Sequence, residues 1–390
     1  MEKDRDSREA GEWICPRRTT RQVYVGKVPV GGEAPVSVQT MTKTDTRNVR
    51  ATVDQVRELE NLGCDIIRLA VPDAASARAL KTIRRSIHIP MVADIHFDYR
   101  LAIMALEAGA DGLRLNPGNI GSVRNIREVV RAARERRVPI RIGVNAGSLE
   151  KDLLARHGGA SAQALVASAL RHVRILEDLN YREIKISVKA SDVARTVQAY
   201  RGLAGQTDYP LHLGVTEAGT LLSGTIRSCA ALGILLAEGI GDTLRVSLTE
   251  HPARELRVGL GLLRGLGLRT PGPSVISCPT CGRVQIDVIT LAHRVEDELE
   301  KIFREFPGVT WPVVAVMGCM VNGPGEAREA DIAIAGGNRK AALYVKGKHL
   351  ATVAERDSLA AVVSQVREFL GQSQKRKAKQ CKSKPRPNKR

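Results

Sequence analysis

The chain has 390 residues, of which 43% are hydrophobic and 26% are charged. This composition is typical of a globular protein and excludes wholesale disorder, and the length favours two or three domains. No apolar run reaches the roughly 18 residues that a membrane span needs, and the first residues mix both charges without an apolar segment, so we expect a cytoplasmic protein with no secretory signal and no membrane association.

The net charge of +18 is distributed unevenly along the chain. Residues 375–390 contain nine Lys or Arg and no acid, so half of the excess lies at the C-terminus. We expect residues 372–390 to form a disordered basic tail, because such a block cannot bury a core. Nucleic-acid binding by this tail is an alternative that its lack of aromatic residues disfavours. The remaining surplus suits a body that binds anionic small molecules.

After a flexible segment at residues 1–18, short β-branched runs alternate with longer helical patterns. The predicted strands are 36–41, 65–70, 91–95, 112–115, 140–144, 183–188, 211–215 and 243–248. Between them, segments such as 53–62, 101–108, 123–136 and 193–203 carry apolar residues at helical spacing. This alternation predicts an α/β fold in which residues 19–270 form a parallel (β/α)8 barrel, with a doubly wound open sheet as the alternative.

Nearly every predicted strand ends in a polar or charged residue, at the face where a barrel places its active site. These residues are Arg68, Asp94, His96, Arg114, Asn116, Arg141, Asn145, Lys189, Glu217, Arg245 and Ser247. A surface ion pair is the alternative for any single arginine. Cations that converge from several strands repel one another unless an anion lies between them, so the pattern predicts a polyanionic ligand, most plausibly a diphosphate.

The pattern changes after Pro271, Gly272 and Pro273, which mark a linker. Strands are predicted near 274–277, 313–316 and 331–335, with helices at 287–303 and 358–371. Residues 271–371 are therefore predicted to form a second, smaller α+β domain.

This second domain contains a CxxC pair, Cys278 and Cys281, and a third thiol, Cys319, 38 residues further on. A CxxC pair alone is common to zinc, iron–sulfur and dithiol redox sites. No second pair and no paired histidine completes a closed zinc site here. Three thiolates suit a 4Fe–4S cluster with one iron free of cysteine, and Glu326, after a Gly-rich turn, is the candidate fourth ligand.

Sequence blocks spread over both domains resemble one known family. They are VQTMTKTDT (38–46), ADIHFD (93–98), RLNPGN (114–119), RIGVNAGSLE (141–150), SVKASD (187–192), HLGVTEAG (212–219), EGIGDTLRVSL (238–248), CPTCGR (278–283) and GCMVNGPGEA (318–327). Their order and content closely resemble the two-domain bacterial form of 4-hydroxy-3-methylbut-2-enyl diphosphate synthase, an iron–sulfur oxidoreductase of the methylerythritol phosphate route to isoprenoids. The resemblance extends from about Arg17 to Leu370.

The resemblance implies a barrel that binds 2-C-methyl-D-erythritol 2,4-cyclodiphosphate and a cluster domain through which two electrons open and dehydrate the ring. It implies that one 4Fe–4S cluster per chain is held by Cys278, Cys281, Cys319 and Glu326. It implies that the diphosphate is bound by Arg68, Arg114, Arg141, Lys189, Arg245 and Ser247. Asp94, Asn145 and Glu217 would line the reacting carbons as polar or acid–base groups, and Glu326 would give way to a substrate oxygen.

The same resemblance implies a head-to-tail homodimer whose active site is shared between chains, and reduced flavodoxin or ferredoxin as the electron donor. Two other functions fit parts of the sequence. A zinc-knuckle nucleic-acid-binding protein would account for the CxxC pair and the basic tail. A metal-independent barrel enzyme acting on sugar phosphates would account for the strand-end cations alone.

Overall fold

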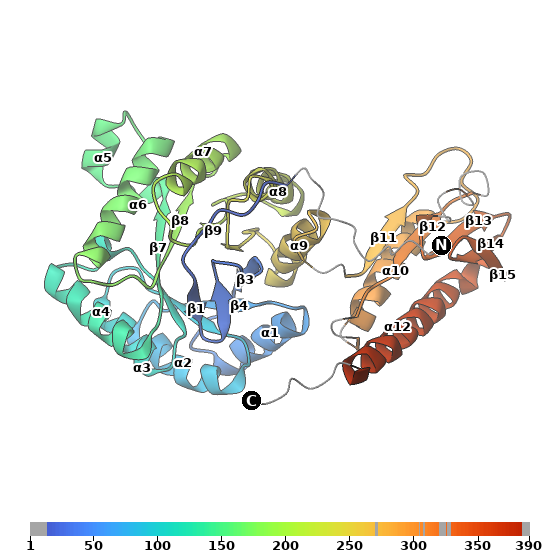
Figure 1. Ribbon diagram of the computed structural model, residues 1–390, viewed down its shortest axis with the longest axis horizontal. Helices are drawn as coiled ribbons and strands as arrows, with labels where there is room; N and C mark the ends of the chain where they lie inside the picture. Colours follow the sequence, from blue (N-terminus) through green and yellow to red (C-terminus); the bar gives the residue numbers. More distant parts are fainter. Residues whose placement is uncertain are drawn as a thin grey trace. The chain divides into compact units, whose positions relative to one another are not determined.

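The computed structural model describes residues 14–269, 272–303, 305–306, 309–319, 325 and 329–383. The chain divides into two compact units, residues 1–269 and 270–390 (Figure 1). Each unit has its own hydrophobic core. Among the helices of the described residues, none is long and apolar enough to cross a membrane.

The first unit is built on an eight-stranded sheet in the order β8-β7-β6-β5-β4-β3-β10-β9. Its strands are β3 Ser37–Met41, β4 Ile66–Ala70, β5 Met91–Asp94, β6 Gly112–Arg114, β7 Ile140–Asn145, β8 Ile184–Lys189, β9 His212–Leu213 and β10 Thr243–Leu244. All neighbours are parallel, and a bridge between Ile186 and Leu211 joins β8 to β9. The sheet therefore closes into the predicted (β/α)8 barrel, and the open-sheet alternative is wrong.

Helices surround the strands (Figure 1). They are α1 Val49–Asn61, α2 Ala74–Ser86, α3 Tyr99–Glu107, α4 Val123–Arg136, α5 Lys151–Arg156, α6 Ala162–Glu177, α7 Val193–Ala204, α8 Leu221–Ala237 and α9 Pro252–Gly265, with the short 3₁₀ helices η1 Pro117–Asn119 and η2 Ala146–Ser148. Side chains of Asp73, Ser122 and Asp192 cap the first turns of α2, α4 and α7, so polar residues directly after strands or loops fix where these helices begin.

Strand alternation divides each barrel strand into an outer and an inner set of side chains. Along β7, Ile140, Ile142 and Val144 belong to the core shared with the helices. Arg141 and Gly143 lie between them in the sequence and are also buried, so they point into the barrel. The same period places charged residues of the other strands inside the barrel.

A small hairpin closes the end of the barrel at which the strands begin. It consists of β1 Val23–Val25 and β2 Val28–Val30, which pair antiparallel around Gly26 at φ +55°. Val23, Val25 and Val30 form one buried cluster with Ile66 of β4 and Val92 of β5. The sequence did not predict this hairpin, because strands of three residues are too short for a periodic pattern.

The second unit is a five-stranded sheet in the order β11-β12-β13-β14-β15. Its elements are β11 Ser274–Ser277, α10 Val288–Phe303, β12 Val313–Met317, β13 Ile332–Gly337, β14 Lys340–Val345, β15 Lys348–Ala354, the 3₁₀ helix η3 Glu355–Asp357 and α12 Ser358–Ser383. The first three strands are parallel, and β14 and β15 add an antiparallel hairpin that the sequence prediction omitted. Leu299 of α10, Val366 of α12 and Val314 of β12 lie in one core.

The C-terminal segment differs from the sequence prediction. We expected an unstructured tail from residue 372, but α12 continues to Ser383, and residues 384–390 lie outside the described part. Lys, Arg, Gln and Ala are good helix formers, so the segment can extend a helix that the domain core has already started.

Candidate functional site

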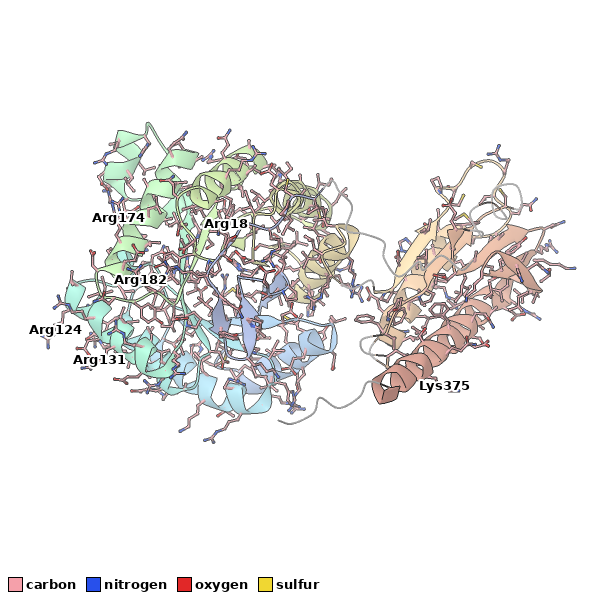
Figure 2. The ribbon with its side chains drawn as sticks, in the orientation of Figure 1. Arg18, Arg124, Arg131, Arg174, Arg182 and Lys375 are labelled. Atoms are coloured by element: carbon pink, nitrogen blue, oxygen red, sulfur yellow. The ribbon has the colours of Figure 1, made fainter. Side chains whose placement is uncertain are left out.

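The interior of the barrel is polar. Its buried inward-facing side chains are Ser37, Gln39, Asp94, Arg114, Arg141, Lys185, Ser187, Lys189, His212 and Thr243, and Arg68 and Arg245 join them with partial exposure. Barrels of this class normally fill their centre with Val, Ile and Leu. The exposed arginines on the outside, such as Arg124 and Arg131 of α4, are solvated surface groups (Figure 2). The inner set is therefore exceptional in both place and chemistry.

Strand register aligns the charged residues side by side. Asp94 of β5 is paired with Arg114 of β6, and Arg114 is paired with Arg141 of β7. Arg141 is in turn paired with Lys185 of β8. Paired residues on neighbouring strands are about 5 Å apart. One carboxylate and three cations thus form a row across four adjacent strands.

Asp94, the first residue of this row, is the centre of a cluster of charged side chains. Its Oδ1 lies 3.4 Å from Arg114 Nη1, and its Oδ2 lies 3.7 Å from Arg68 Nε and 3.6 Å from His96 Nε2. Burial raises the pKa of Asp94, but Arg68, His96 and Arg114 outweigh that effect, so its pKa lies well below the usual range. Asp94 is therefore an ionised carboxylate in the site.

Arg245, which follows β10, is held by a second buried carboxylate. Its Nη2 lies 3.3 Å from Oε2 of Glu255, a buried residue in the first turn of α9. Glu255 also accepts hydrogen bonds from Thr40 Oγ1 at 3.0 Å and from the backbone N–H of Leu248 at 3.0 Å. Glu255 thus fixes the position of Arg245 and balances its charge.

Two inward-facing glycines make room for the cations. A Cβ at Gly143 would lie 2.6 Å from Arg114 Nε, and the Gly143 carbonyl accepts a hydrogen bond of 2.9 Å from Arg114 Nη2. A Cβ at Gly214, which follows β9, would lie 2.4 Å from Lys189 Nζ. Any side chain at these positions would displace the arginine or the lysine.

The charges inside the barrel do not balance. The buried acids of the described barrel residues are Asp94, Asp242 and Glu255, and Asp242 lies at the start of β10, paired with Arg17. Asp94 and Glu255 therefore face four arginines, which stay charged, and two buried lysines. These basic residues are Arg68, Arg114, Arg141, Arg245, Lys185 and Lys189. Burial, then Arg141 and the other arginines, lower the pKa of Lys189 far below its usual value. A bound polyanion would relieve this repulsion.

Three other residues predicted from strand ends make fewer side-chain interactions. Asn145 and Ser247 are half-buried, and Glu217 is exposed in the left-handed region at φ +52°. In the described part of the chain, no side-chain hydrogen bond is formed by any of the three. They lie at or after the carboxyl ends of β7, β10 and β9, so they line the opening of the barrel and are absent from its charged interior.

Sequence reasoning missed several residues of this interior. Lys185 lies within a predicted strand, four residues before Lys189, so strict alternation would have placed it on the same face. His212 and Gln39 are fully buried, and their side chains have no hydrogen-bond partner among the described residues. Glu255 gave no signal, because only the folded barrel brings a helical acid to Arg245.

The second unit brings two of the predicted thiol ligands to neighbouring strand ends. Cys278 directly follows β11 and Cys319 lies two residues after β12, while β11 and β12 are parallel partners. The backbone N–H of Cys278 donates to the Val316 carbonyl at 3.0 Å, and Thr280 at φ +66° turns the chain between Cys278 and Cys281.

All three thiols are free of disulfides, and three soft sulfur donors suit an iron–sulfur cluster. Glu326, the candidate fourth ligand, lies outside the described residues.

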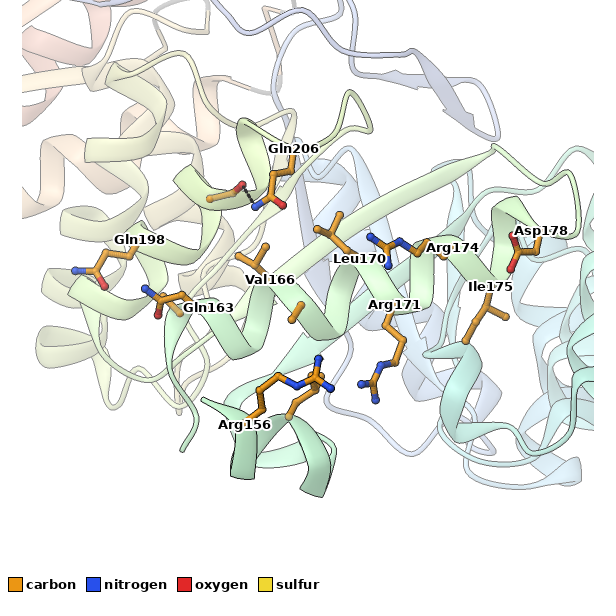
Figure 3. A pocket seen from close by; sticks show the side chains of 14 residues that line it. Arg156, Gln163, Val166, Leu170, Arg171, Arg174, Ile175, Asp178, Gln198 and Gln206 are labelled. Carbon is orange, nitrogen blue, oxygen red and sulfur yellow. Dashed lines mark hydrogen bonds between the residues drawn. The ribbon is translucent and has the colours of Figure 1, made fainter. Parts of the chain in front are cut away.

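A separate groove of about 830 Å³ lies on the outer flank of the barrel, over α6 and next to α5 and α7 (Figure 3). Its lining combines apolar residues such as Val166 and Leu170 with arginines. Arg156 and Arg174 are exposed, and Arg171 Nη2 is paired with Asp152 Oδ2 at 2.6 Å. Solvent and a carboxylate compensate these charges, so we assign the candidate site to the barrel interior and not to this groove.

Comparison with known proteins covers both units. Residues 20–260 match the model of the GcpE TIM-barrel domain, and residues 274–368 match the model of the GcpE protein C-terminal domain.

Two curated relatives, from Geobacter sulfurreducens and Caldanaerobacter subterraneus subsp. tengcongensis, are each named 4-hydroxy-3-methylbut-2-en-1-yl diphosphate synthase (flavodoxin). The first is 58% identical over 353 residues, which cover 90% of this chain and 98% of the relative. The second is 54% identical over 357 residues, which cover 92% of this chain and 99% of the relative. Among solved structures, dihydropteroate synthase from Stenotrophomonas maltophilia is 12% identical, with a TM-score of 0.46 over 62% of this chain and 98% of its own, a likeness too weak to bear on function.

Proposed function

The chain belongs to the GcpE family of 4-hydroxy-3-methylbut-2-en-1-yl diphosphate synthases, and from this premise we propose how its residues perform the reaction. The enzyme is an oxidoreductase of isoprenoid biosynthesis that converts 2-C-methyl-D-erythritol 2,4-cyclodiphosphate to 4-hydroxy-3-methylbut-2-enyl diphosphate. The relatives support neither a zinc-knuckle nucleic-acid-binding protein nor a metal-independent sugar-phosphate enzyme. The observation that carries our assignment of the substrate site is the excess of buried cations inside the barrel.

In this proposal the diphosphate lies among the cations of the barrel interior. Arg114 and Arg141 are neighbours in register, and Arg68 and Arg245 approach from β4 and β10. Arginine forks can each grip two phosphate oxygens, and Lys189 adds a point charge. Ser247 at the opening would donate a hydroxyl. These fixed contacts would keep the diphosphate in place after the ring has opened, which limits the loss of orientation between steps.

We assign Asp94, Asn145 and Glu217 to the reacting carbons. Asp94 is ionised and buried, so it can accept a hydrogen bond from a ring hydroxyl or orient a water molecule. Asn145 is half-buried at the end of β7, where its amide can donate to the same region. Glu217 is exposed beyond β9, where a carboxyl group can exchange protons with solvent.

Cys278, Cys281, Cys319 and Glu326 would hold a 4Fe–4S cluster, one per chain. When bound, the cluster supplies the two electrons of the reduction one at a time and a Lewis-acidic iron. Cys278 and Cys319 follow adjacent parallel strands, which would fix two of the thiolates relative to each other. A carboxylate at Glu326 would exchange more readily than a fourth thiolate, which would leave one iron open to a substrate oxygen.

We further propose that the chain works as a homodimer and accepts electrons from a reduced flavodoxin, with ferredoxin as a second donor. The printed name of both relatives specifies flavodoxin. Flavodoxins and ferredoxins are small acidic proteins, and the net charge of +18 would favour their approach. Light scattering of the anaerobically purified protein tests the dimer, and a mass of 42.3 kDa, that of one chain, would contradict it.

The decisive experiment is anaerobic turnover of the cyclic diphosphate with reduced flavodoxin or ferredoxin. We expect a brown protein that contains iron and inorganic sulfide and forms the linear diphosphate. A colourless protein that contains zinc, or turnover that is unaffected by oxygen, would contradict the proposal.

Glu326→Ala tests the fourth ligand separately. This variant should keep much of its iron and its colour but lose turnover. Full activity of the variant would remove Glu326 from the site.

A further inference from the structure

Lys185 lies farther from the carboxyl end of β8 than Lys189, the lysine assigned to the diphosphate. It lies four residues before Lys189 on β8, so both side chains share the inner face of that strand. Lys185 is 2% exposed, and its register partner on β7 is Arg141, which is also 2% exposed. Two cations on adjacent strands are thus fully removed from solvent.

No carboxylate compensates Lys185. Within the described residues, its ammonium group forms neither a hydrogen bond nor an ion pair. The buried acids are already engaged, Asp94 by Arg68 and Arg114, and Glu255 by Arg245. The titratable and charged groups that face this interior from the surrounding elements are Arg68 of β4, Asp94 of β5, Arg114 of β6, Arg141 of β7, Lys189 of β8, His212 of β9, Arg245 of β10 and Tyr200 of α7.

Among these buried basic residues, a lysine can lose its proton whereas an arginine cannot. Burial, and then the charge of Arg141, lower the pKa of Lys185 to about 7. The arginines keep their protons in a protein at any ordinary pH. Burial, and then the charges of Arg141 and the lysines, lower the pKa of His212 well below its ordinary value, so it is neutral and adds no charge.

We propose that Lys185 is a proton-accepting residue of the anion site, which takes up one proton when a polyanion enters the barrel and gives it back when the polyanion leaves. The inference rests on the proposed function of the barrel. The added proton comes from solvent and binds the amine of Lys185, so no bond to the ligand forms and no electrons move. The charge of the site therefore adjusts to the charge of its occupant.

The reaction itself gives this adjustment a purpose. Each phosphate of the cyclic diphosphate has one acidic oxygen, because both ends of the diphosphate are esterified to the ring. When the bond between a ring carbon and a phosphate oxygen breaks, the terminal phosphate gains a second ionisable oxygen. A protonated Lys185 would balance this additional negative charge. Lys189 and His212, whose pKa values burial and the neighbouring cations also lower, are the other buried basic groups of the described interior that can titrate.

The test uses the full-length protein, purified without oxygen, and inorganic pyrophosphate as the probe. Titration calorimetry at pH 8 in two buffers of different ionisation enthalpy gives the protons taken up per pyrophosphate bound. For each pyrophosphate bound, we expect the wild type to take up more protons than Lys185→Met and Lys185→Arg, by at most one. Pyrophosphate itself titrates in this range, but Lys185→Arg carries the same charge beside the bound anion as the protonated wild type, so the difference between these two proteins isolates the proton taken up by Lys185.

Sulfate, which does not titrate, provides an independent measurement. Between pH 7.5 and 9 we expect the logarithm of its Kd to rise with pH, and the slope to be smaller by about one unit in Lys185→Arg, whose side chain stays charged. Lys151→Met removes an exposed lysine of α5 and should match the wild type in both experiments.

Equal proton uptake by the wild type and Lys185→Arg, with pyrophosphate still bound, would overturn the inference and leave the proposed function intact. A flat sulfate profile in the wild type would also overturn it, even if Lys185→Met fails to fold. Failure of the wild type to bind pyrophosphate would instead contradict the proposed anion site itself, and the inference with it.

Discussion

The interior of the barrel and the cysteine module place their reactive groups by different means. In the barrel, Arg114, Arg141 and Lys185 are spaced by strand register, and inward-facing glycines leave room for the charged side chains. In the module, Cys278 and Cys319 stand just beyond strands, and Cys281 lies in a turn. Register fixes the position of a side chain without any ligand, whereas loop positions depend more on what they bind. The barrel site is therefore expected to be preorganised, and the cysteine site to be completed by its metal.

Cys319→Ser should separate the two regions most sharply. Protein purified without oxygen should lack the brown colour and have no detectable turnover, because one thiolate ligand is gone. Its Kd for pyrophosphate should stay within about twofold of the wild type, since the residues assigned to the anion all belong to the barrel unit and Cys319 belongs to the other unit. Iron analysis, activity and calorimetry measure the three quantities.

Cys229→Ser is the matched control, because this half-buried thiol belongs to α8 of the barrel unit. It should keep both colour and turnover. A brown, active Cys319→Ser protein would contradict the ligand assignment.

Arg141→Met should reverse this pattern. The variant should keep its colour but bind pyrophosphate at least about 30-fold more weakly, because removing a buried charged partner costs roughly 2–5 kcal/mol. The Kd is measured by calorimetry. Arg131→Met, at an exposed position of α4, should bind like the wild type. If Arg141→Met binds pyrophosphate with an unchanged Kd, the anion lies elsewhere in the molecule.

Gly214→Ala tests whether space inside the barrel is limiting. The new Cβ would lie 2.4 Å from Lys189 Nζ and 3.0 Å from the Arg245 carbonyl oxygen, so Lys189 must move. We expect about tenfold weaker pyrophosphate binding, equivalent to about 1.4 kcal/mol.

The control for this substitution is Gly261→Ala in α9, where a Cβ meets no atom within 4 Å. It should leave binding unchanged and raise the free energy of unfolding by about 0.5–1 kcal/mol, because alanine favours a helix over glycine. If both alanine variants bind pyrophosphate with the Kd of the wild type, the Lys189 side chain can move without loss of its contact with the anion.

Val25→Ala should have the smallest effect on the chemistry. Val25 is fully buried in the cluster that closes the barrel floor, so its truncation should lower the free energy of unfolding by about 2 kcal/mol. Pyrophosphate binding and colour should not change at 25 °C. Urea unfolding provides the first quantity and calorimetry the second. A loss of binding that accompanies full folding would mean that the floor also shapes the anion site.

The sequence predicted the barrel and most of its charged residues because the strands alternate strictly. Arg114 ends β6 and Arg141 is the second residue of β7, both among apolar neighbours, and this pattern was the basis for predicting an anion site. The prediction did not include Lys185, although strand alternation places it on the same face of β8 as Lys189. Glu255 could not have been found, since its role depends on where α9 packs against β3 and β10.

Short elements were the other source of error. The predicted strands 211–215 and 243–248 shorten to β9 His212–Leu213 and β10 Thr243–Leu244, with one further bridge from Leu211 to Ile186. The strands of the β1–β2 hairpin have three residues each, too few for a periodic pattern, whereas β14 and β15 have six and seven residues whose burial does not alternate. Cys278 and Cys281 were identified by spacing alone, which requires no knowledge of the fold.

The hairpin floor has a kinetic consequence. Val23, Val25 and Val30 pack against Ile66 and Val92 and cover the end of the barrel at which the strands begin, so a ligand of the barrel interior enters from the end at which the strands finish. Product leaves through the same open end of the barrel by which substrate enters, so product must dissociate before the next substrate can bind. We therefore expect the product to be a competitive inhibitor with respect to the cyclic diphosphate. We also expect the rate of product release to set an upper bound on the turnover rate.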